Sequence, residues 1–200
     1  MFTLATIAIT MFADLDNNDL FFVQQVDVSN TNTEPDLSDI TEGFAAFKDV
    51  LDNFGPTSLG PRNLDLGGGQ FDTATIELAK IDVQNNVADL FGRSKVHNKK
   101  VLEAGPYDSM TSFSVLNVID TDTNRYKHIE LSHRLLKAGG CAYFKIWEGD
   151  ATGTAFTDED SKRHQENKKT KAFLPFVEEI YVGSKIACVE DQYLIVACKP

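Results

Sequence analysis

A glycine turn flanked by carboxylates stands in the sequence LDLGGGQFD. Gly67, Gly68 and Gly69 have no Cβ, so a ligand can approach the main chain closely at this turn. Asp65 precedes the glycines and Asp72 follows them, which places negative charge on both sides. The pattern predicts a binding loop for a ligand that needs bare backbone and carries positive charge.

A dinucleotide matches this turn poorly. Nicotinamide and flavin enzymes use the pattern G-x-G-x-x-G beside a pyrophosphate, and Asp72 stands where the third glycine would be. Its carboxylate would repel phosphate and occupy the positive end of the following helix. S-adenosyl-L-methionine (SAM) matches better, because it has no phosphate and carries an ammonium, which Asp65 can attract, and a cationic sulfur.

A second acid is expected about twenty residues further on, where it would accept the ribose hydroxyls. Asp89 in NVADLF stands at that distance, whereas Asp82 comes too early unless the intervening helix is short. The alternatives without a ligand stay open: Asp89 could be a surface acid, and the glycines could form an ordinary strand-to-helix turn.

Strand-like and helix-like segments alternate around these residues, which predicts a mostly parallel sheet covered by helices, with ligands at the carboxyl ends of the strands. The last two strand-like runs are joined only by Glu190-Asp191, and so short a link permits only an antiparallel hairpin. A Gly139-Gly140 pair is expected to end the helix before the 141–147 strand. Predicted strands cover residues 63–67, 86–91, 109–119, 141–147, 184–190 and 192–200, and predicted helices cover 38–54, 71–81, 94–105 and 123–139.

On these segments the chain resembles the class I SAM-dependent methyltransferases. LDLGGGQFD is similar to their first motif, (D/E)xGxGxG, with Phe71 in place of the last glycine. More narrowly, DLFGRSKVHNKKVL, SFSVLNVI, LLKAGGCAYFKIWEGDATGT and QENKKTKAFLPFVEEIYVG resemble a group of small phage and bacterial methyltransferase-like proteins of unassigned substrate. The match runs from about residue 60 to the C-terminus. It implies a Rossmann-like α/β sandwich in which the usual third strand is missing or vestigial, since only a helix separates Asp89 from the next strand.

The resemblance also implies residue roles. The glycine turn and Asp65 would hold the methionine part of SAM, Asp89 the ribose, and Leu90 and Phe91 the adenine, while the segment from Ser114 would face the transferable methyl group. The implied cofactor-binding residues are Asp65, Gly67, Gly68, Gly69, Asp72, Asp89, Leu90, Phe91, Ser114, Val115 and Leu116.

Methyl transfer needs alignment of acceptor, methyl and sulfur, and it needs a general base only if the acceptor must lose a proton. No DPPY or NPPY tetrapeptide is present, and VLNV stands in its place. Asn117 could hydrogen-bond an acceptor amine or hydroxyl, or simply cap the strand end. Glu148 could act as base and Trp147 could stack on a planar acceptor, or they could be a solvated acid and a lid over the core. Lys145 and Asn167 complete the expected acceptor residues.

The net charge of −11 opposes tight binding to nucleic acid or to an anionic membrane. Two basic islands, GRSKVHNKK and SKRHQENKKTK, are either solvated helix faces or a cleft for an anionic acceptor. The acceptor is therefore an unidentified small molecule or nucleotide-like anion, with nucleic acid possible but not favoured by charge. His97 and His128 are predicted to be surface residues of helices.

Cys141, Cys188 and Cys198 are odd in number and widely spaced, so neither a disulfide nor a metal site is expected, but buried thiols in a reducing cytosol. The apolar opening, MFTLATIAITMF, is too short to span a bilayer and lacks a basic n-region. We expect a cytoplasmic protein, in a host cell if it is viral.

Two units are expected: an acidic N-terminal extension with a lead-in helix packed on the core (1–59), and a SAM-binding domain (60–200). The leading functional hypothesis is a SAM-dependent methyltransferase. The rival is a non-catalytic SAM-fold module that binds a partner enzyme through its acidic N-terminal section.

Overall fold

A computed structural model of the 200-residue chain describes residues 37–158 and 163–200. The predictions made for the apolar opening and for the rest of the first 36 residues lie outside this part. No helix in the described ranges combines the length and apolar character that crossing a membrane requires.

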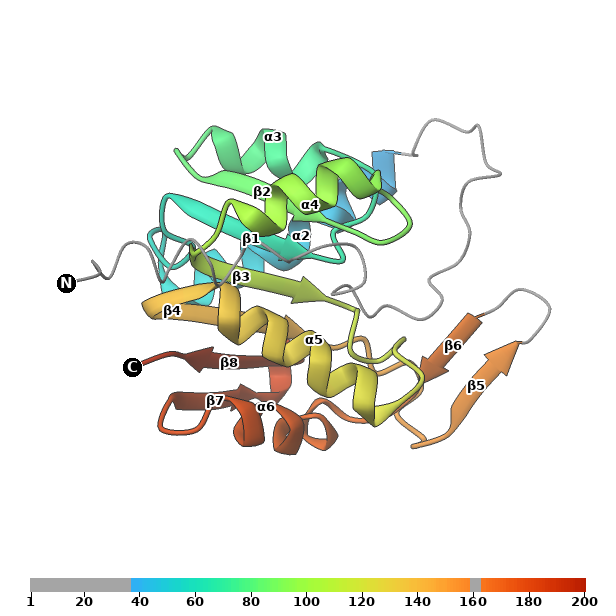
Figure 1. Cartoon of the computed structure of the whole chain (residues 1–200). Coiled ribbons are helices and arrows are strands. Elements are labelled where there is room, and N and C mark those ends of the chain that lie inside the picture. The colour runs from blue at the N-terminus through green and yellow to red at the C-terminus, as the bar shows by residue number, and fades with distance from the viewer. Residues whose placement is uncertain (1–36, 159–162) are drawn as a thin grey trace.

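A six-stranded sheet with the order β2-β1-β3-β4-β8-β7 forms the centre of the molecule (Figure 1). The first four strands are parallel, and β8 pairs antiparallel with both β4 and β7, as the short link at Glu190-Asp191 predicted. Among the described residues no strand lies outside β2, so this part of the chain lacks the usual third strand, as expected. The strands are β1 (Arg62–Leu66), β2 (Gln84–Ala88), β3 (Tyr107–Phe113), β4 (Leu136–Lys145), β7 (Lys185–Val189) and β8 (Leu194–Cys198).

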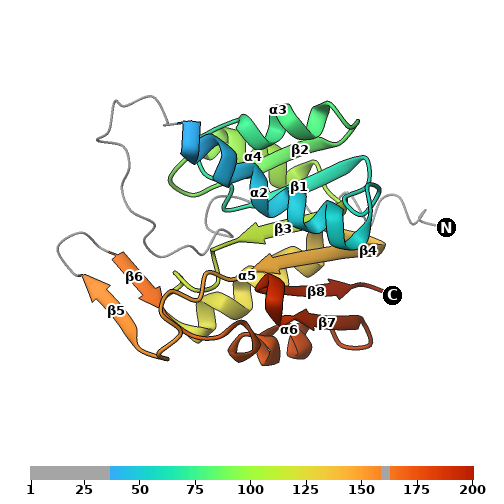
Figure 2. The same cartoon turned by 180° about the vertical axis from the view of Figure 1, so that it is seen from behind.

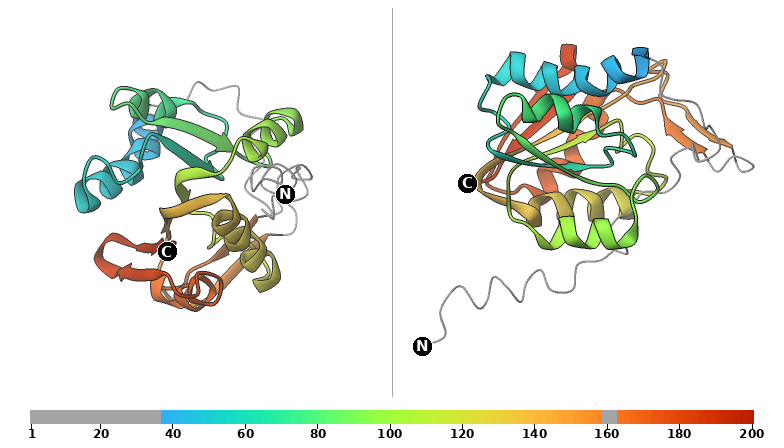
Figure 3. Two further views of the ribbon diagram at one scale, coloured as in Figure 1. Left: turned by 60° about the vertical axis from the view of Figure 1, so that its left-hand side comes forward. Right: turned by 90° about the horizontal axis from the view of Figure 1, so that it is seen from above.

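Helices cover both faces of this sheet. One face carries α4 (Lys95–Glu103), α5 (Asp122–Leu135) and α6 (Leu174–Ile180), and the other carries α2 (Leu37–Phe54) and α3 (Thr73–Ala79) (Figures 1 to 3). Each set of helices closes its own apolar cluster against the strands. The helix predicted for residues 38–54 is present as α2, and its Phe47 and Val50 are buried against β4 and β8 residues.

A separate two-stranded hairpin, β5 (Ala155–Asp158) and β6 (Arg163–Glu166), stands beyond the end of β3 (Figures 1 and 2). Neither this hairpin nor α6 was predicted from the sequence. Because β1 to β4 are parallel, the hairpin lies at the edge of the sheet where their carboxyl ends meet.

Two predicted boundaries are wrong. The helix α5 ends at Leu135, and Gly139-Gly140 lie inside β4 instead of stopping the helix. A Cβ at Gly140 would lie 2.6 Å from the carbonyl oxygen of Asp108, so glycine allows the close approach of β3. The strand β3 ends at Phe113 instead of residue 119, because Ser114 takes a left-handed conformation (φ 57°) that turns the chain.

The expectation of three free thiols is also wrong, because Cys141 and Cys198 form a disulfide. These residues stand directly opposite each other on β4 and β8, with their Cα atoms 4.0 Å apart. Antiparallel pairing therefore brings together two cysteines that are 57 positions apart in the chain. Cys188 on β7 remains a free thiol.

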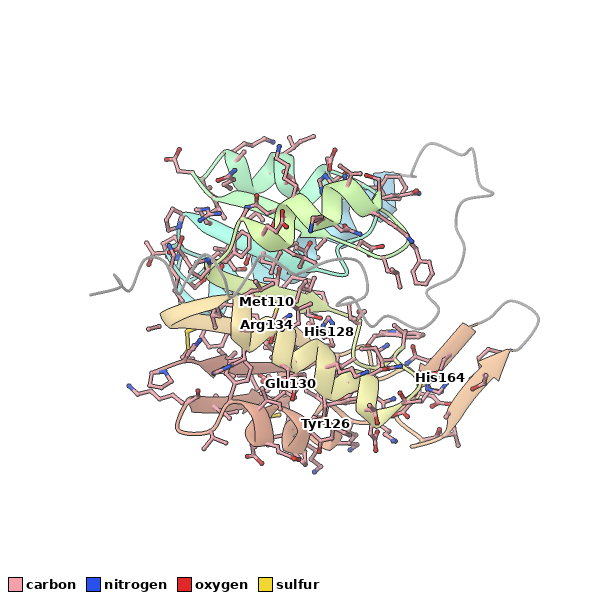
Figure 4. All side chains as sticks on the ribbon, in the orientation of Figure 1. Met110, Tyr126, His128, Glu130, Arg134 and His164 are labelled. Atoms are coloured by element: carbon pink, nitrogen blue, oxygen red, sulfur yellow. A yellow bond between two sulfur atoms is a disulfide. The ribbon has the colours of Figure 1, made fainter. Side chains whose placement is uncertain are left out.

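The prediction that His128 lies on the surface is wrong too, because it is fully buried. Its Nε2 atom lies 2.8 Å from the Ser112 hydroxyl on β3, and Figure 4 shows its position on α5. Burial lowers the pKa of His128 to about 3, so the imidazole is neutral. The inner face of α5 also buries Arg125 and Ser132, and this polar composition concealed the buried stripe.

Candidate functional site

Asp65 lies near the carboxyl end of β1, with only 4% of its surface exposed. The β1–β3 register places it opposite Thr111, whose hydroxyl donates to Asp65 Oδ1 (3.1 Å). The pKa of Asp65 is raised to about 7, mainly by burial and also by the charge of Asp89, while the Thr111 hydrogen bond opposes the rise. A Cβ at Gly68 would clash with the Asp65 carboxylate, so the turn must be glycine here.

Asp89 directly follows β2 and is 1% exposed. Its Oδ2 atom accepts the Gly69 N–H (3.0 Å), and its Oδ1 atom accepts the N–H groups of Phe91 (2.9 Å) and Gly92 (2.6 Å). Since β1 and β2 are neighbours, this carboxylate ties the glycine turn to the turn after β2. Asp82, the alternative acid, precedes β2 and thus lies at the opposite end of that strand.

Arg93 is a residue of this site that sequence reasoning missed. Its Nε donates to the Gly69 carbonyl (3.0 Å), and its Nη2 donates to the Phe71 carbonyl (3.2 Å) and pairs with Asp72 (2.7 Å). Asp72 stands at the start of α3 but makes no side-chain cap there. Its charge is neutralised by Arg93, so the acidic character of the turn comes from Asp65 and Asp89. The basic island GRSK contained this arginine, but its direction could not be read from the sequence.

The residues expected around the adenine and the methyl group divide into exposed and buried ones. Phe91 is 51% exposed, whereas Leu90 packs against the core. Ser114 is exposed at the turn after β3, whereas Val115 and Leu116 are each 1% exposed and belong to the core. Only the main chain of these two core residues could contact a cofactor.

Arg125 of α5 holds the loop that follows β3. This guanidinium is 1% exposed, donates to the carbonyls of Leu116 (3.0 Å) and Ile119, and pairs with Glu166 Oε1 (2.7 Å). The loop is therefore fixed both to the helix and to strand β6 of the hairpin. Mixed polar and apolar spacing along α5 gave no sign of this buried charge.

Asn117 lies in that loop and is completely buried. Its Nδ2 donates to Gln165 Oε1 (2.9 Å), and Gln165 Nε2 donates to the carbonyls of Trp147 (3.3 Å) and Glu166 (2.9 Å). Carbonyl oxygens only accept, so Gln165 must present its oxygen to Asn117, and Asn117 Oδ1 is left without a partner among the described residues.

The expected acceptor residues lie in two places. Trp147 (59% exposed) and Glu148 lie beside the hairpin, but Glu148 Oε1 already accepts the N–H (2.6 Å) and hydroxyl (2.8 Å) of Thr170. Asn167 packs against Gly149, where a Cβ would clash with its amide. Lys145 lies away from the hairpin, on the face of the sheet covered by α2 and α3, where it pairs with Asp49 of α2.

Comparison with known proteins adds a fold-level result. No protein-family model and no curated protein sequence matches the chain. Among solved structures, it is similar to the sugar N-methyltransferase KedS8 from Streptoalloteichus sp. (TM-score 0.56, 13% identity, 88% of this chain and 99% of that one). It is also similar to DesVI from Streptomyces venezuelae (TM-score 0.54, 13% identity, 84% and 100%). A third is the SAM-bound amino pentose methyltransferase CalS10 from Micromonospora echinaspora (TM-score 0.54, 12% identity, 86% and 100%).

These likenesses, together with the strand order and the closing antiparallel hairpin, define the class I SAM-dependent methyltransferase fold. Identities this low assign the chain to no subgroup within that fold.

Proposed function

We propose that this protein is a SAM-dependent methyltransferase acting on an unidentified acceptor. The observation that carries the proposal is a pair of buried carboxylates, Asp65 and Asp89, on neighbouring strands beside a glycine turn. No ion pair within residues 37–158 and 163–200 involves either acid. Buried carboxylates that lack a cationic partner favour a cationic ligand.

SAM supplies a methyl group on a cationic sulfur, and its ammonium suits the Asp65 carboxylate. Asp89 suits the ribose hydroxyls, although three of its roughly four acceptor positions already receive main-chain N–H groups. Phe91 offers an exposed aromatic surface for the adenine. Asn117 is completely buried, so it would hold the loop after β3 against the hairpin instead of touching the acceptor, and alignment of the reactants would not need a dedicated base.

A small acceptor agrees better with the described charges than a nucleic acid does. In the two basic islands, Arg93 pairs with Asp72, Lys99 with Glu103 and Lys168 with Glu166. These pairs weaken the positive field that phosphate binding would need.

Isothermal calorimetry of the full chain with SAM, S-adenosylhomocysteine (SAH) and NAD tests the proposal. We expect SAM and SAH to bind and NAD not to bind. Asp89→Asn should weaken SAH binding, while Asp191→Asn, at an exposed acid of the β7–β8 turn, is the matched control. Tight binding of NAD without any response to SAM would overturn the proposal.

The second candidate is a non-catalytic module that binds a partner enzyme through its N-terminal section. One observation favours it: the turns after β1 and β2 are in direct contact, since a Cβ at Gly92 would lie 2.5 Å from the Gly69 carbonyl carbon. Turns packed this closely leave less room for a cofactor between them. Incubation with SAM and a metabolite and nucleic-acid extract separates the two, because an enzyme forms SAH and a module does not.

A further inference from the structure

The outer edge of β2 is where the usual third strand would pair, and no strand of residues 37–158 or 163–200 lies there. Along its inner edge β2 pairs with β1, and the Gly67 N–H donates to the Ala88 carbonyl there (2.8 Å). Because neighbouring residues of a strand direct their main-chain groups to opposite edges, Val87 and Asp89 face outward. Without a neighbouring strand these groups need other partners.

Two side chains of α4 provide those partners. His97 Nε2 lies 2.9 Å from the Val87 carbonyl, and it must donate, since a carbonyl only accepts. Asn98 Oδ1 accepts the Asp89 N–H (3.1 Å), and Asn98 Nδ2 donates to the Asp89 carbonyl (2.7 Å). A single amide thus makes both hydrogen bonds that a neighbouring strand would make with the main chain of Asp89.

The start of α4 explains why these side chains reach β2. Ser94 caps the helix by accepting the His97 N–H (3.2 Å), so α4 begins soon after Asp89. The following apolar residues Val101 and Leu102 are buried in the core, which fixes the helix against the sheet. Asn98 is itself completely buried.

We propose that Asn98 is a positioning residue that replaces the missing third strand and holds Asp89 in place for the ribose hydroxyls. This inference rests on the proposed SAM-dependent function. Asn98 fixes the main chain of Asp89 from outside the sheet, while Gly69, Phe91 and Gly92 fix its carboxylate from inside. Asn98 thus sets the position of the Asp89 main chain, from which the carboxylate reaches these three N–H groups.

The test compares SAH with its 2′-deoxyribose analogue by isothermal calorimetry on the full chain. We expect the unmodified protein to bind SAH about tenfold or more tightly than the analogue, since a hydroxyl bound to a carboxylate is a charge-assisted hydrogen bond. Asn98→Leu should lower SAH affinity about tenfold and bring the ratio of the two affinities close to one. A purely structural role would weaken both ligands equally and leave the ratio unchanged.

Asn86→Leu is the matched control. Asn86 lies on the same strand and donates to the carbonyls of Asn63 (3.2 Å) and Gln84 (3.1 Å), away from Asp89. It should change stability without changing the affinity ratio. Should Asn98→Leu fail to fold by circular dichroism, Asn98→Ala replaces it, because it removes the same amide without a larger side chain and without a buried charge. Its ratio should also fall close to one.

The outcomes are distinguishable. If the unmodified protein binds no SAH, the proposed function fails. If it binds SAH and the analogue equally, or if the Asn98 variants keep the full ratio, the proposed function stands and the role of Asn98 is overturned.

Discussion

Replacement of Asp65 by asparagine tests the charge on which the site depends. The folded protein raises the pKa of this carboxyl from 3.8 to about 7, mainly through burial. Because the folded protein raises this pKa, the carboxyl costs no stability below pH 3.8, where it is protonated in both states. The cost grows as the pH rises from 3.8 to 7 and is complete above 7. At pH 8 the ionised carboxylate therefore costs roughly 4 kcal/mol, at about 1.4 kcal/mol per pKa unit.

Asp65→Asn removes the charge, nearly preserves the shape, and retains an oxygen that can accept from Thr111. We expect the variant to be more stable than the unmodified protein at pH 8, by up to about 4 kcal/mol, and similar to it near pH 4. The pH-dependent contribution of His128 is common to both proteins and cancels in the difference.

Urea unfolding at several pH values between 4 and 8 measures this difference. Calorimetry with SAM provides the second measurement, because the variant should bind SAM about ten to a hundredfold more weakly at pH 8, having lost a charge-assisted hydrogen bond to the ammonium. Below pH 6 the two affinities should converge, since Asp65 is then protonated in the unmodified protein.

A stability difference that does not change with pH would refute the raised pKa of Asp65. Unchanged SAM affinity at pH 8 would refute its contact with the ammonium, even if the stability result agrees. The Thr111→Val variant is a useful companion, because it removes the one hydroxyl that stabilises the ionised carboxylate and should raise the pKa of Asp65 still further.

Three other predictions concern the scaffold. Gly92→Ala should lower the free energy of unfolding by about 1–3 kcal/mol, because its Cβ would meet the main chain of Gly69 and Gln70; an unchanged urea midpoint would contradict the contact between the two turns. The free energy of unfolding should fall by roughly 5 kcal/mol as the pH drops from 6.5 to 3, because the unfolded chain binds a proton at His128 that the buried imidazole does not. His128→Gln should make the free energy of unfolding change less over this pH range. Alkylation of the native chain should modify Cys188 alone and, after reduction, all three cysteines; labelling of Cys141 before reduction would exclude the disulfide. Reduction should lower the free energy of unfolding by about 4 kcal/mol, because the disulfide joins residues 57 positions apart.

The sheet and the two buried acids could be predicted because their signals are local. Alternation of strands and helices sets the parallel order, and a two-residue link leaves only an antiparallel hairpin. An acid at the end of each of the first two strands must come to the same edge of the sheet, as Asp65 and Asp89 do.

The misses depend on contacts that only the assembled fold creates. Cys141 and Cys198 become partners through the β4–β8 register, which no spacing in the sequence reveals. Gly140 looked like a helix stop, but the approach of Asp108 requires it within a strand. Arg93 and Asn98 stand in a basic, polar segment typical of a solvated surface, yet Arg93 binds the turn after β1 and Asn98 binds the end of β2. Long-range geometry, not residue type, gives them their roles.

Within the described residues β2 is the outermost strand of the sheet, and Asp89 directly follows it. Local opening of that edge would displace Asp89, and with it the proposed ribose contact, without unfolding the rest. Any ligand held by Asp89 must stabilise the closed edge by the free energy it loses when the edge opens. Ligand binding should therefore slow amide hydrogen exchange at Val87 and Asp89, because both depend on how often this edge opens.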